Sequence, residues 1–354
     1  MVVVKNRARL FSNQRPDIWV TVGPPPCSTL ENMMGMIKEG GCALRLSYSF
    51  GTQERQKEIA LNMKAIARLA ERDDVILVAD LEGGKMRLET FPNEPYTIPL
   101  SAGDIVRFVR DKSAFDRDKK IIPVKSQVFF GAVHEGSEIT LGDGSACLTV
   151  VGKQEHVVTC KSLEGGFVHT AAGVTFQSET FQPRCLEEKD KRDLVFIAST
   201  GLYNAVAISF VGSADDVREA RWIVDRTTPG LPVIAKIETP SGVKNAFEIA
   251  AESDAIMVAC GDLALSAPWY ELGNNADLVV SATEKANKPW IIATQLLQGL
   301  EHQCIPMRAE ITNMTHWVHE GAAALVLADE TAYGTRPVES VRAAKRIIAA
   351  ALRR

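Results

Sequence analysis

Eight short apolar runs recur along this chain of 354 residues, and most are followed by an amphipathic segment. The runs comprise residues 18–23, 42–49, 75–80, 204–210, 232–238, 255–262, 289–295 and 323–330. Segments with helical spacing include residues 52–71, 213–225 and 340–354. Strands that alternate with helices form parallel βα units, and eight such units close a barrel. We therefore predict an α/β fold built on a (β/α)8 TIM barrel.

The alternation stops between about residue 90 and residue 183. This stretch is rich in Val, Thr, Phe and Gly, and turn clusters such as HEGSE, LGDGS and SLEGG follow at short intervals. Such a pattern predicts a small β domain inserted between the third strand and its helix. We expect the barrel to comprise residues 1–89 and 184–354, and the inserted domain to comprise residues 90–183.

Composition limits the classes of function. The chain is 46% hydrophobic and 24% charged with a net charge of -4, which indicates a soluble globular protein without the basic surplus typical of nucleic-acid binding. No apolar stretch is long enough to span a membrane, and the N-terminal residues lack the order of a secretory signal. Seven scattered cysteines without paired spacing indicate free thiols, so we expect a cytoplasmic protein.

Polar side chains gather at the carboxyl ends of the apolar runs, where a barrel of this kind carries its active site. They are Thr21, Arg45, Ser47, Ser49, Asp80, Ser209, Lys236, Glu238, Asp262, Thr294 and Glu330. Any one of them could be a satisfied core ion or a helix cap. Because polar groups at the buried mouth of a barrel cost stability, their recurrence on nearly every run favours a functional site.

The residue types at this end indicate chemistry on an anion. Lys236 and Glu238 are two residues apart on one strand, so their side chains point to the same face. Glu238 and Asp262 offer the hard carboxylate oxygens that Mg²⁺ or Mn²⁺ prefers. Lys236 and Arg45 could hold a phosphate or carboxylate beside such an ion. Because no histidine ends a run, zinc sites and histidine-dependent nucleophiles are disfavoured, and the residues predict a magnesium-bound anionic substrate.

The motifs around these residues resemble those of the pyruvate kinase family. LRLSYSFGTQE and VADLEGGKMRL are similar to the family's motifs after the second and third strands. AKIETPSGVKNAFEIAAESDAIMVACGDLAL is similar to the stretch that carries its metal ligands, and PWIIATQLLQ, MRAEITNM and EGAAALVLADETAYGTRPVESV follow in order. The resemblance covers both barrel segments. It implies a (β/α)8 barrel with a small β-barrel lid domain inserted after strand 3, and we expect the family's C-terminal domain to be absent.

The resemblance implies Mg²⁺-dependent phosphoryl transfer between phosphoenolpyruvate or pyruvate and a nucleotide such as ADP or ATP. Glu238 and Asp262 would bind the metal. The implied catalytic residues are Lys236, Arg45, Thr294 and Glu330; the implied substrate residues are Arg45, Ser209, Lys236, Gly261, Asp262 and Thr294; the implied nucleotide residues are Thr21, Pro24, Ser47 and Arg87. We expect no control through a C-terminal domain, and a homodimer or higher homo-oligomer is compatible with the family.

Lys85 stands where many members of the family have a glutamate and require K⁺. The resemblance implies that the lysine ammonium takes the place of the monovalent cation, near Ser47, Ser49 and Asp80. We therefore expect no K⁺ requirement.

Two departures from the family pattern leave other functions open. Ala171 stands where the lid has a lysine that clamps the nucleotide, and Ala328 where the family has a serine linked to protonation of the enolpyruvate. Both favour an alternative in which the Mg–enolpyruvate site serves phosphoryl transfer to a non-nucleotide acceptor, or lyase or decarboxylase chemistry on the pyruvate enolate. A third hypothesis is a catalytically weak paralogue that binds phosphoenolpyruvate, which the intact metal ligands disfavour. Lys153, Lys161 or His169 could replace the missing lid cation.

Overall fold

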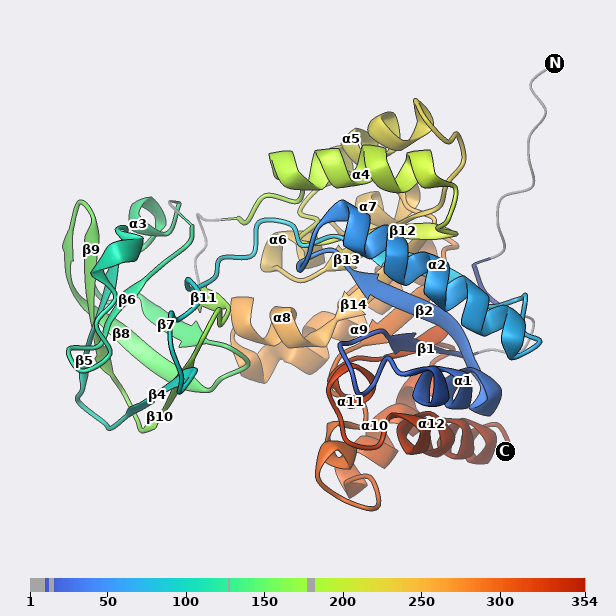
Figure 1. Cartoon of the computed structure of the whole chain (residues 1–354). Coiled ribbons are helices and arrows are strands. Elements are labelled where there is room, and N and C mark those ends of the chain that lie inside the picture. Colours follow the sequence, from blue (N-terminus) through green and yellow to red (C-terminus); the bar gives the residue numbers. More distant parts are fainter. Residues whose placement is uncertain (1–9, 13–15, 127, 177–181, 354) are drawn as a thin grey trace. The chain divides into compact units, whose positions relative to one another are not determined.

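The computed structural model describes residues 10–12, 16–126, 128–176 and 182–353, and the chain forms two compact units (Figure 1). Unit 1 consists of Met1–Gly83, Arg184–Gly261 and Gly273–Arg354. Unit 2 consists of Gly84–Pro183 and Asp262–Leu272. The domain boundaries at residues 90 and 183 stay a prediction.

Unit 1 contains a closed parallel barrel, which confirms the predicted (β/α)8 fold. Among the described residues, its strands close in the order β1-β16-β15-β14-β13-β12-β3-β2. They are β1 (Asp17–Thr21), β2 (Gly41–Ser47), β3 (Ile76–Asp80), β12 (Ala205–Ile208), β13 (Val233–Ile237), β14 (Ala255–Ala259), β15 (Trp290–Ala293) and β16 (Ala324–Leu327). Each strand overlaps one of the eight apolar runs, because a parallel strand covered on both faces is apolar throughout.

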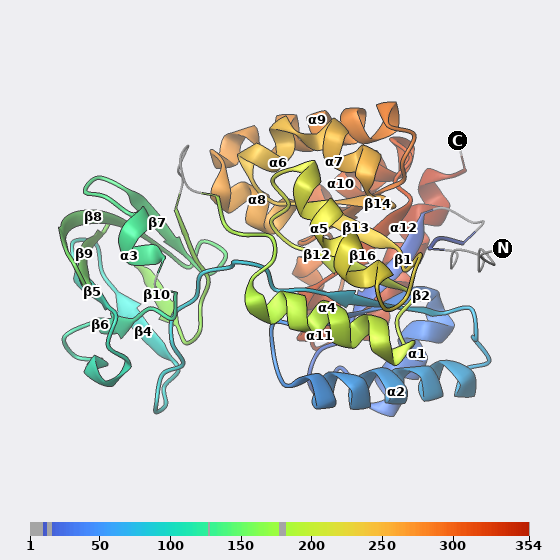
Figure 2. The same cartoon turned by 90° about the horizontal axis from the view of Figure 1, so that it is seen from above.

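Helices surround the barrel strands (Figure 2). They are α1 (Leu30–Glu39), α2 (Gln53–Leu69), α4 (Glu188–Thr200), α5 (Ala214–Asp225), α6 (Pro240–Lys244), α7 (Ala246–Glu252), α9 (Leu272–Lys285), η3 (Gln298–Glu301), α10 (Arg308–His319), α11 (Asp329–Ala332) and α12 (Pro337–Ala351). Side chains cap several of these helices at their N-termini; the hydroxyl of Thr52, for example, accepts a hydrogen bond from the backbone N–H of Arg55. The three amphipathic segments of the sequence correspond to α2, α5 and α12.

Residues that face the barrel interior change from apolar to polar toward the carboxyl ends of the strands. One buried apolar cluster includes Trp19, Ala43, Val78, Ala207 and Ile234. Two residues further along the chain from these five stand Thr21, Arg45, Asp80, Ser209 and Lys236. Because side chains two apart on a strand face the same way, these polar side chains form the next layer of the interior. The barrel thus carries its polar residues at the end that the sequence predicts.

Unit 2 is mainly β and follows β3 in the chain, as predicted. Its described strands form a six-stranded sheet, β11-β7-β8-β9-β5-β6, and a two-stranded sheet, β10-β4. The expected small barrel is therefore a partial one. The elements of unit 2 are β4 (Thr97–Leu100), β5 (Ile105–Val109), η1 (Lys112–Ala114), β6 (Ile121–Pro123), α3 (Phe129–Ala132), β7 (Glu138–Leu141), β8 (Ala146–Gln154), β9 (Val157–Ser162), β10 (Gly166–His169), β11 (Val174–Phe176) and η2 (Trp269–Glu271), with most of α8 (Cys260–Ser266).

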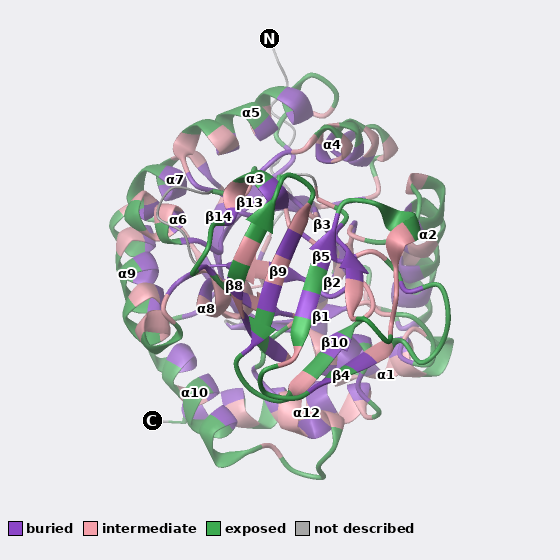
Figure 3. Cartoon of the chain, turned by 90° about the vertical axis from the view of Figure 1, so that its left-hand side faces the viewer, coloured by how far each residue is buried: buried purple, intermediate pink, exposed green. Residues whose placement is uncertain are grey.

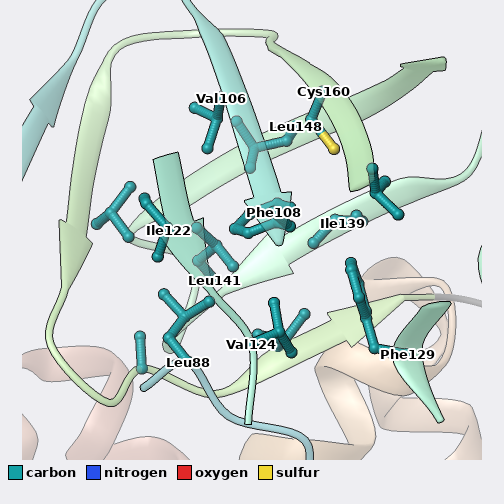
Figure 4. Close-up of a cluster of buried hydrophobic side chains, with 14 of the residues drawn as sticks. Leu88, Val106, Phe108, Ile122, Val124, Phe129, Ile139, Leu141, Leu148 and Cys160 are labelled. Atoms are coloured by element: carbon teal, nitrogen blue, oxygen red, sulfur yellow. The ribbon is translucent and has the colours of Figure 1, made fainter. Parts of the chain in front are cut away.

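Unit 2 has an apolar core of its own. Buried positions alternate with more exposed ones in the first half of β8, as expected for a sheet with one covered face (Figure 3). The buried side chains include Phe108, Phe129, Ile122 and Leu148 (Figure 4). The rings of Phe108 and Phe129 meet edge to face with their centroids 5.6 Å apart.

Candidate active site

Asp80, the last residue of β3, accepts hydrogen bonds from two cationic side chains. Arg45 Nε donates to Oδ2 of Asp80, and Lys236 Nζ lies 3.1 Å from Oδ1. Burial alone would raise the pKa of Asp80, but Arg45 and Lys236 outweigh burial and hold this pKa below its usual range. Asp80 is therefore an ionised carboxylate that connects the ends of β2, β3 and β13.

The ammonium group of Lys236 is held by several acceptors. Besides Asp80, they are Ser209 Oγ at 2.8 Å and Glu238 Oε1 at 3.1 Å. The Lys236 side chain is only 9% exposed. An ammonium group has three N–H donors, so these oxygens fix its position and stabilise its charge.

Glu238 comes directly after β13 and is fully buried. Its Oε1 lies beside Lys236, and its Oε2 accepts a hydrogen bond of 2.7 Å from the backbone N–H of Phe210. Ser209, next to Phe210, donates its hydroxyl to the carbonyl oxygen of Leu81 at 2.7 Å. The carboxylate of Glu238 is therefore anchored at both oxygens, and its role as a metal ligand stays a prediction.

Arg45 links the same group to β1. Its Nη1 donates to Thr21 Oγ1 at 3.0 Å, and this hydroxyl in turn donates to the carbonyl oxygen of Leu327 at 2.9 Å. Burial would lower the pKa of Arg45, but Asp80 and other carboxylates nearby raise it, so the guanidinium stays charged. The Arg45 side chain is 20% exposed, more than that of Lys236, so an incoming anion can reach it.

Thr294 lies at the end of β15 in a strained conformation, next to Gly261. Its φ angle is 82°, and that of Gln295 is 55°. A β-branched residue at positive φ is a rare and costly conformation. A Cβ added to Gly261 would lie 2.7 Å from Cγ2 of Thr294. Only glycine fits there, and the predicted pair of Thr294 and Gly261 is thus brought together.

Glu330, in α11, has both carboxylate oxygens bound to backbone N–H groups. Oε1 accepts from Leu297 at 2.9 Å and Oε2 accepts from Ala328 at 2.8 Å. Burial raises the pKa of Glu330 to about 7, although these N–H groups favour the ionised form and lower it. Asp329, the adjacent carboxylate, raises the same pKa further.

The predicted nucleotide residues of unit 1 lie at the ends of β1 and β2. Pro24 is exposed in the segment that follows β1. Ser47 ends β2, and its hydroxyl oxygen accepts a hydrogen bond of 3.3 Å from the backbone N–H of Ser49. Their role toward a nucleotide stays a prediction.

Three further predicted residues, Lys85, Arg87 and Asp262, belong to unit 2. Lys85 Nζ lies 2.7 Å from Oδ1 of Asp262, which is in the first turn of α8. Arg87 Nη1 donates to the carbonyl oxygen of Ala171 at 3.3 Å. The role of Lys85 as a substitute for a monovalent cation stays a prediction, as does the sharing of one divalent ion by Glu238 and Asp262.

The structure brings one group of predicted residues into direct contact in unit 1: Thr21, Arg45, Asp80, Ser209, Lys236 and Glu238. Sequence reasoning missed the central place of Asp80 between the two cations, although its position at the end of an apolar run was a signal. It also missed Asp329, whose charge acts on Arg45 and on Glu330. The signal for Asp329 was an acidic residue two positions after the end of the eighth strand.

Comparison with known proteins gives this arrangement a family. The model of the pyruvate kinase barrel domain matches residues 13–341. The chain belongs to the pyruvate kinase family. Pyruvate kinase of Thermococcus litoralis is 33% identical over 330 residues, which are 93% of this chain and 68% of that protein. Pyruvate kinase of Mycobacterium intracellulare is 33% identical over 338 residues, 96% of this chain and 70% of that protein.

Membership of the pyruvate kinase family confirms the resemblance of the motifs and the fold that it implies. The relatives are kinases by name, which supports a kinase-like enzyme acting on small molecules. In the part of the chain that the structure describes, no helix is long and apolar enough to cross a membrane.

Proposed function

We propose that this protein transfers a phosphoryl group between phosphoenolpyruvate or pyruvate and a nucleotide such as ADP or ATP, with Mg²⁺ or Mn²⁺ bound. The observation that carries the proposal is the contact of Arg45 and Lys236 with one buried carboxylate, Asp80. Two fixed positive charges at the end of the barrel suit a group that carries several negative charges. Phosphoryl transfer depends mainly on such positioning and neutralisation of charge.

The residues fit a divalent cation. Glu238 and Asp262 are carboxylates, and each already holds a cationic nitrogen, of Lys236 at 3.1 Å and of Lys85 at 2.7 Å respectively. Among the described residues, no three His, Cys, Asp or Glu side chains converge as a metal site. One or two carboxylates completed by substrate and water are what Mg²⁺ commonly takes. The bound ion would supply Lewis-acid stabilisation of phosphoryl and enolate oxygens.

The chain's own side chains would act as follows. Lys236 and Arg45 hold the phosphoryl oxygens and neutralise their charge. Thr294, beside Gly261, donates its hydroxyl to the carboxylate of the substrate. Because the site is largely buried, each of these interactions is stronger than it would be in water.

Lys85 is proposed to make the reaction independent of K⁺, since it supplies a fixed ammonium group in unit 2. Turnover should be the same in K⁺ and in tetramethylammonium salts at constant ionic strength. A several-fold stimulation by K⁺ would contradict this role.

A second candidate function is favoured by Ala171 and Ala328, which lack the side chains that the family uses toward the nucleotide and the enolpyruvate. In this case the site would transfer the phosphoryl group to another acceptor, or act on the pyruvate enolate. Arg87 supports the nucleotide reaction instead, because it donates to the carbonyl of Ala171 and so provides a cation at that position.

The test is formation of pyruvate from phosphoenolpyruvate, ADP and Mg²⁺, followed by coupling to lactate dehydrogenase. Lys236→Met should lower the rate by about 10²–10³-fold, since it removes one charge from the site. Lys119→Met, at an exposed lysine in unit 2, is the matched control and should keep the rate. Exchange of the pyruvate methyl protons without pyruvate formation from phosphoenolpyruvate would favour the second candidate.

A further inference from the structure

Two strand-to-loop corners at the carboxyl end of the barrel have unfavourable backbone conformations. After β15, Thr294 and Gln295 both have positive φ angles, 82° and 55°. After β16, Ala328 has φ -99° and ψ -100°, outside the main helical and extended regions. Such conformations persist only where the surrounding structure holds them.

One carboxylate holds both corners. Glu330 accepts the backbone N–H of Leu297, three residues after Thr294, and the backbone N–H of Ala328 itself. The two strands that precede these corners, β15 and β16, are neighbours in the barrel. Glu330 therefore connects two adjacent strand ends from a position that is 1% exposed.

The short helix that carries Glu330 is itself fixed to the barrel. The hydroxyl oxygen of Thr331 accepts the backbone N–H of Thr21 at 3.0 Å, and the same hydroxyl lies 3.0 Å from the carbonyl oxygen of Leu327. The carboxylate of Glu330 thus acts from a rigid support, as a group that positions others requires.

We propose that Glu330 is a positioning residue: its carboxylate keeps the Thr294–Gln295 corner in shape and so aims the Thr294 hydroxyl at the substrate. It acts through the backbone, because its two oxygens accept hydrogen bonds from N–H groups of the two corners. This inference rests on the proposed function for the ligand of Thr294, and it assigns to Glu330 a role different from the catalytic one expected from the sequence.

Glu310 provides a matched control. It is also buried, and its oxygens also accept two backbone N–H groups, of Gly299 at 2.7 Å and of Met307 at 2.8 Å. The segment it holds contains none of the candidate site residues. Glu310→Gln therefore imposes the same chemical change as Glu330→Gln in a loop of the same unit.

The experiment compares Glu330→Gln with Glu310→Gln in two measurements on the full chain. In each variant an amide NH₂ replaces one acceptor oxygen and faces a backbone N–H. Binding of oxalate with Mg²⁺, measured by calorimetry, should weaken about tenfold or more in Glu330→Gln and stay within about twofold in Glu310→Gln. Hydrogen–deuterium exchange should accelerate at Leu297 and Ala328 only in Glu330→Gln, and at Gly299 and Met307 only in Glu310→Gln.

Each outcome bears on the proposal. Unchanged oxalate affinity and unchanged exchange at Leu297 and Ala328 in Glu330→Gln would overturn it, and so would a lost turnover rate with unchanged oxalate affinity, which indicates direct catalysis. If the wild type binds no oxalate, the proposed function fails, and the exchange measurement still decides whether Glu330 holds the corners.

If Glu330→Gln does not fold, Gln295→Gly is added to it. Glycine adopts a φ angle of 55° without strain, so the corner then needs less support. The double variant should fold and bind oxalate more weakly than the wild type. A double variant that folds and shows no defect in oxalate affinity or in exchange at Ala328 would also contradict the proposal.

Discussion

Lys236 and Glu238, two residues apart at the end of one strand, form an ion pair of 3.1 Å in which both side chains are nearly inaccessible to solvent. Breaking one partner of a buried pair leaves the other charge without compensation. We expect Lys236→Met to lower the free energy of unfolding by about 3 kcal/mol, because the charges of Glu238 and Asp80 lose a shared partner. Urea unfolding measures this, and the exposed control Lys119→Met should show no measurable change. Equal stability of the two variants would contradict the expectation.

Asp80 should contribute to stability in a manner that depends on pH. Its pKa is lowered in the folded protein, since the effect of burial is outweighed by Arg45 and Lys236. A lowered pKa stabilises the fold fully above the unfolded value of about 3.9, and this contribution is lost as the pH falls through the folded pKa. The difference in unfolding free energy between the wild type and Asp80→Asn should therefore be constant from pH 8 to pH 5 and shrink below about pH 4. A difference that grows on acidification would contradict a lowered pKa of Asp80.

Glu330 should show the opposite dependence. Burial raises its pKa to about 7, so between the unfolded value of about 4.3 and this value the folded state binds more protons than the unfolded state. Its contribution to stability therefore falls as the pH rises from about 4 to about 7, by roughly 3 kcal/mol over that window. Glu330→Gln removes this dependence. Unfolding curves of the wild type and of Glu330→Gln at pH 5 and pH 8 provide the measurement. The same change in unfolding free energy in both proteins would contradict the raised pKa of Glu330.

Gly261→Ala should disturb Thr294 directly, since the added Cβ would lie 2.7 Å from Cγ2 of that residue. We expect a loss of about 1–3 kcal/mol in unfolding free energy, as for other overpacked sites. Thr294→Ser removes Cγ2 and keeps the hydroxyl, so it should restore most of the stability lost in Gly261→Ala. Additive effects of the two substitutions in urea unfolding would show that the two residues do not meet as described.

The strained backbone at Thr294 and Gln295 should lower the stability of the fold, and the Thr294 hydroxyl should contribute to substrate binding. Glycine tolerates a φ angle of 82° or 55°, so Thr294→Gly and Gln295→Gly are each expected to raise the unfolding free energy by up to about 1 kcal/mol. Only Thr294→Gly removes the hydroxyl proposed to bind the substrate. Oxalate affinity should therefore fall in Thr294→Gly and be retained in Gln295→Gly. The same oxalate affinity in both variants would show that the Thr294 hydroxyl does not bind the substrate.

Much of the fold follows from local sequence patterns. The eight strands could be predicted because each is largely buried and apolar along most of its length, and α2, α5 and α12 because their apolar residues have helical spacing. The polar layer could be predicted because the two-residue periodicity of a strand continues to its end, where Arg45 and Lys236 follow inward-facing apolar residues.

Other features depend on contacts that leave no local pattern. Lys85 and Asp262 are 177 residues apart in the sequence, and their ion pair follows only from the folded chain. The bonds of Glu330 go to backbone N–H groups, which every residue except proline possesses, so no side-chain motif indicates them. Pairing among strands of three or four residues in unit 2 likewise depends on distant partners, so the sequence alone does not indicate which strands of the lid lie side by side.

The margins of the six-stranded sheet have a consequence for how the molecule behaves in a crowded solution. Its outermost strands are β6 and β11, and residues 86–89 pair with both. Val174 in β11 donates its backbone N–H to the carbonyl oxygen of Met86, and Glu89 donates its backbone N–H to the carbonyl oxygen of Pro123 in β6, each at 2.9 Å. Because these margins are already paired within the chain, an extended peptide from another molecule finds few free backbone groups to which it could bond as a further strand. Unit 2 is thus protected against serving as a template for fibrous self-association.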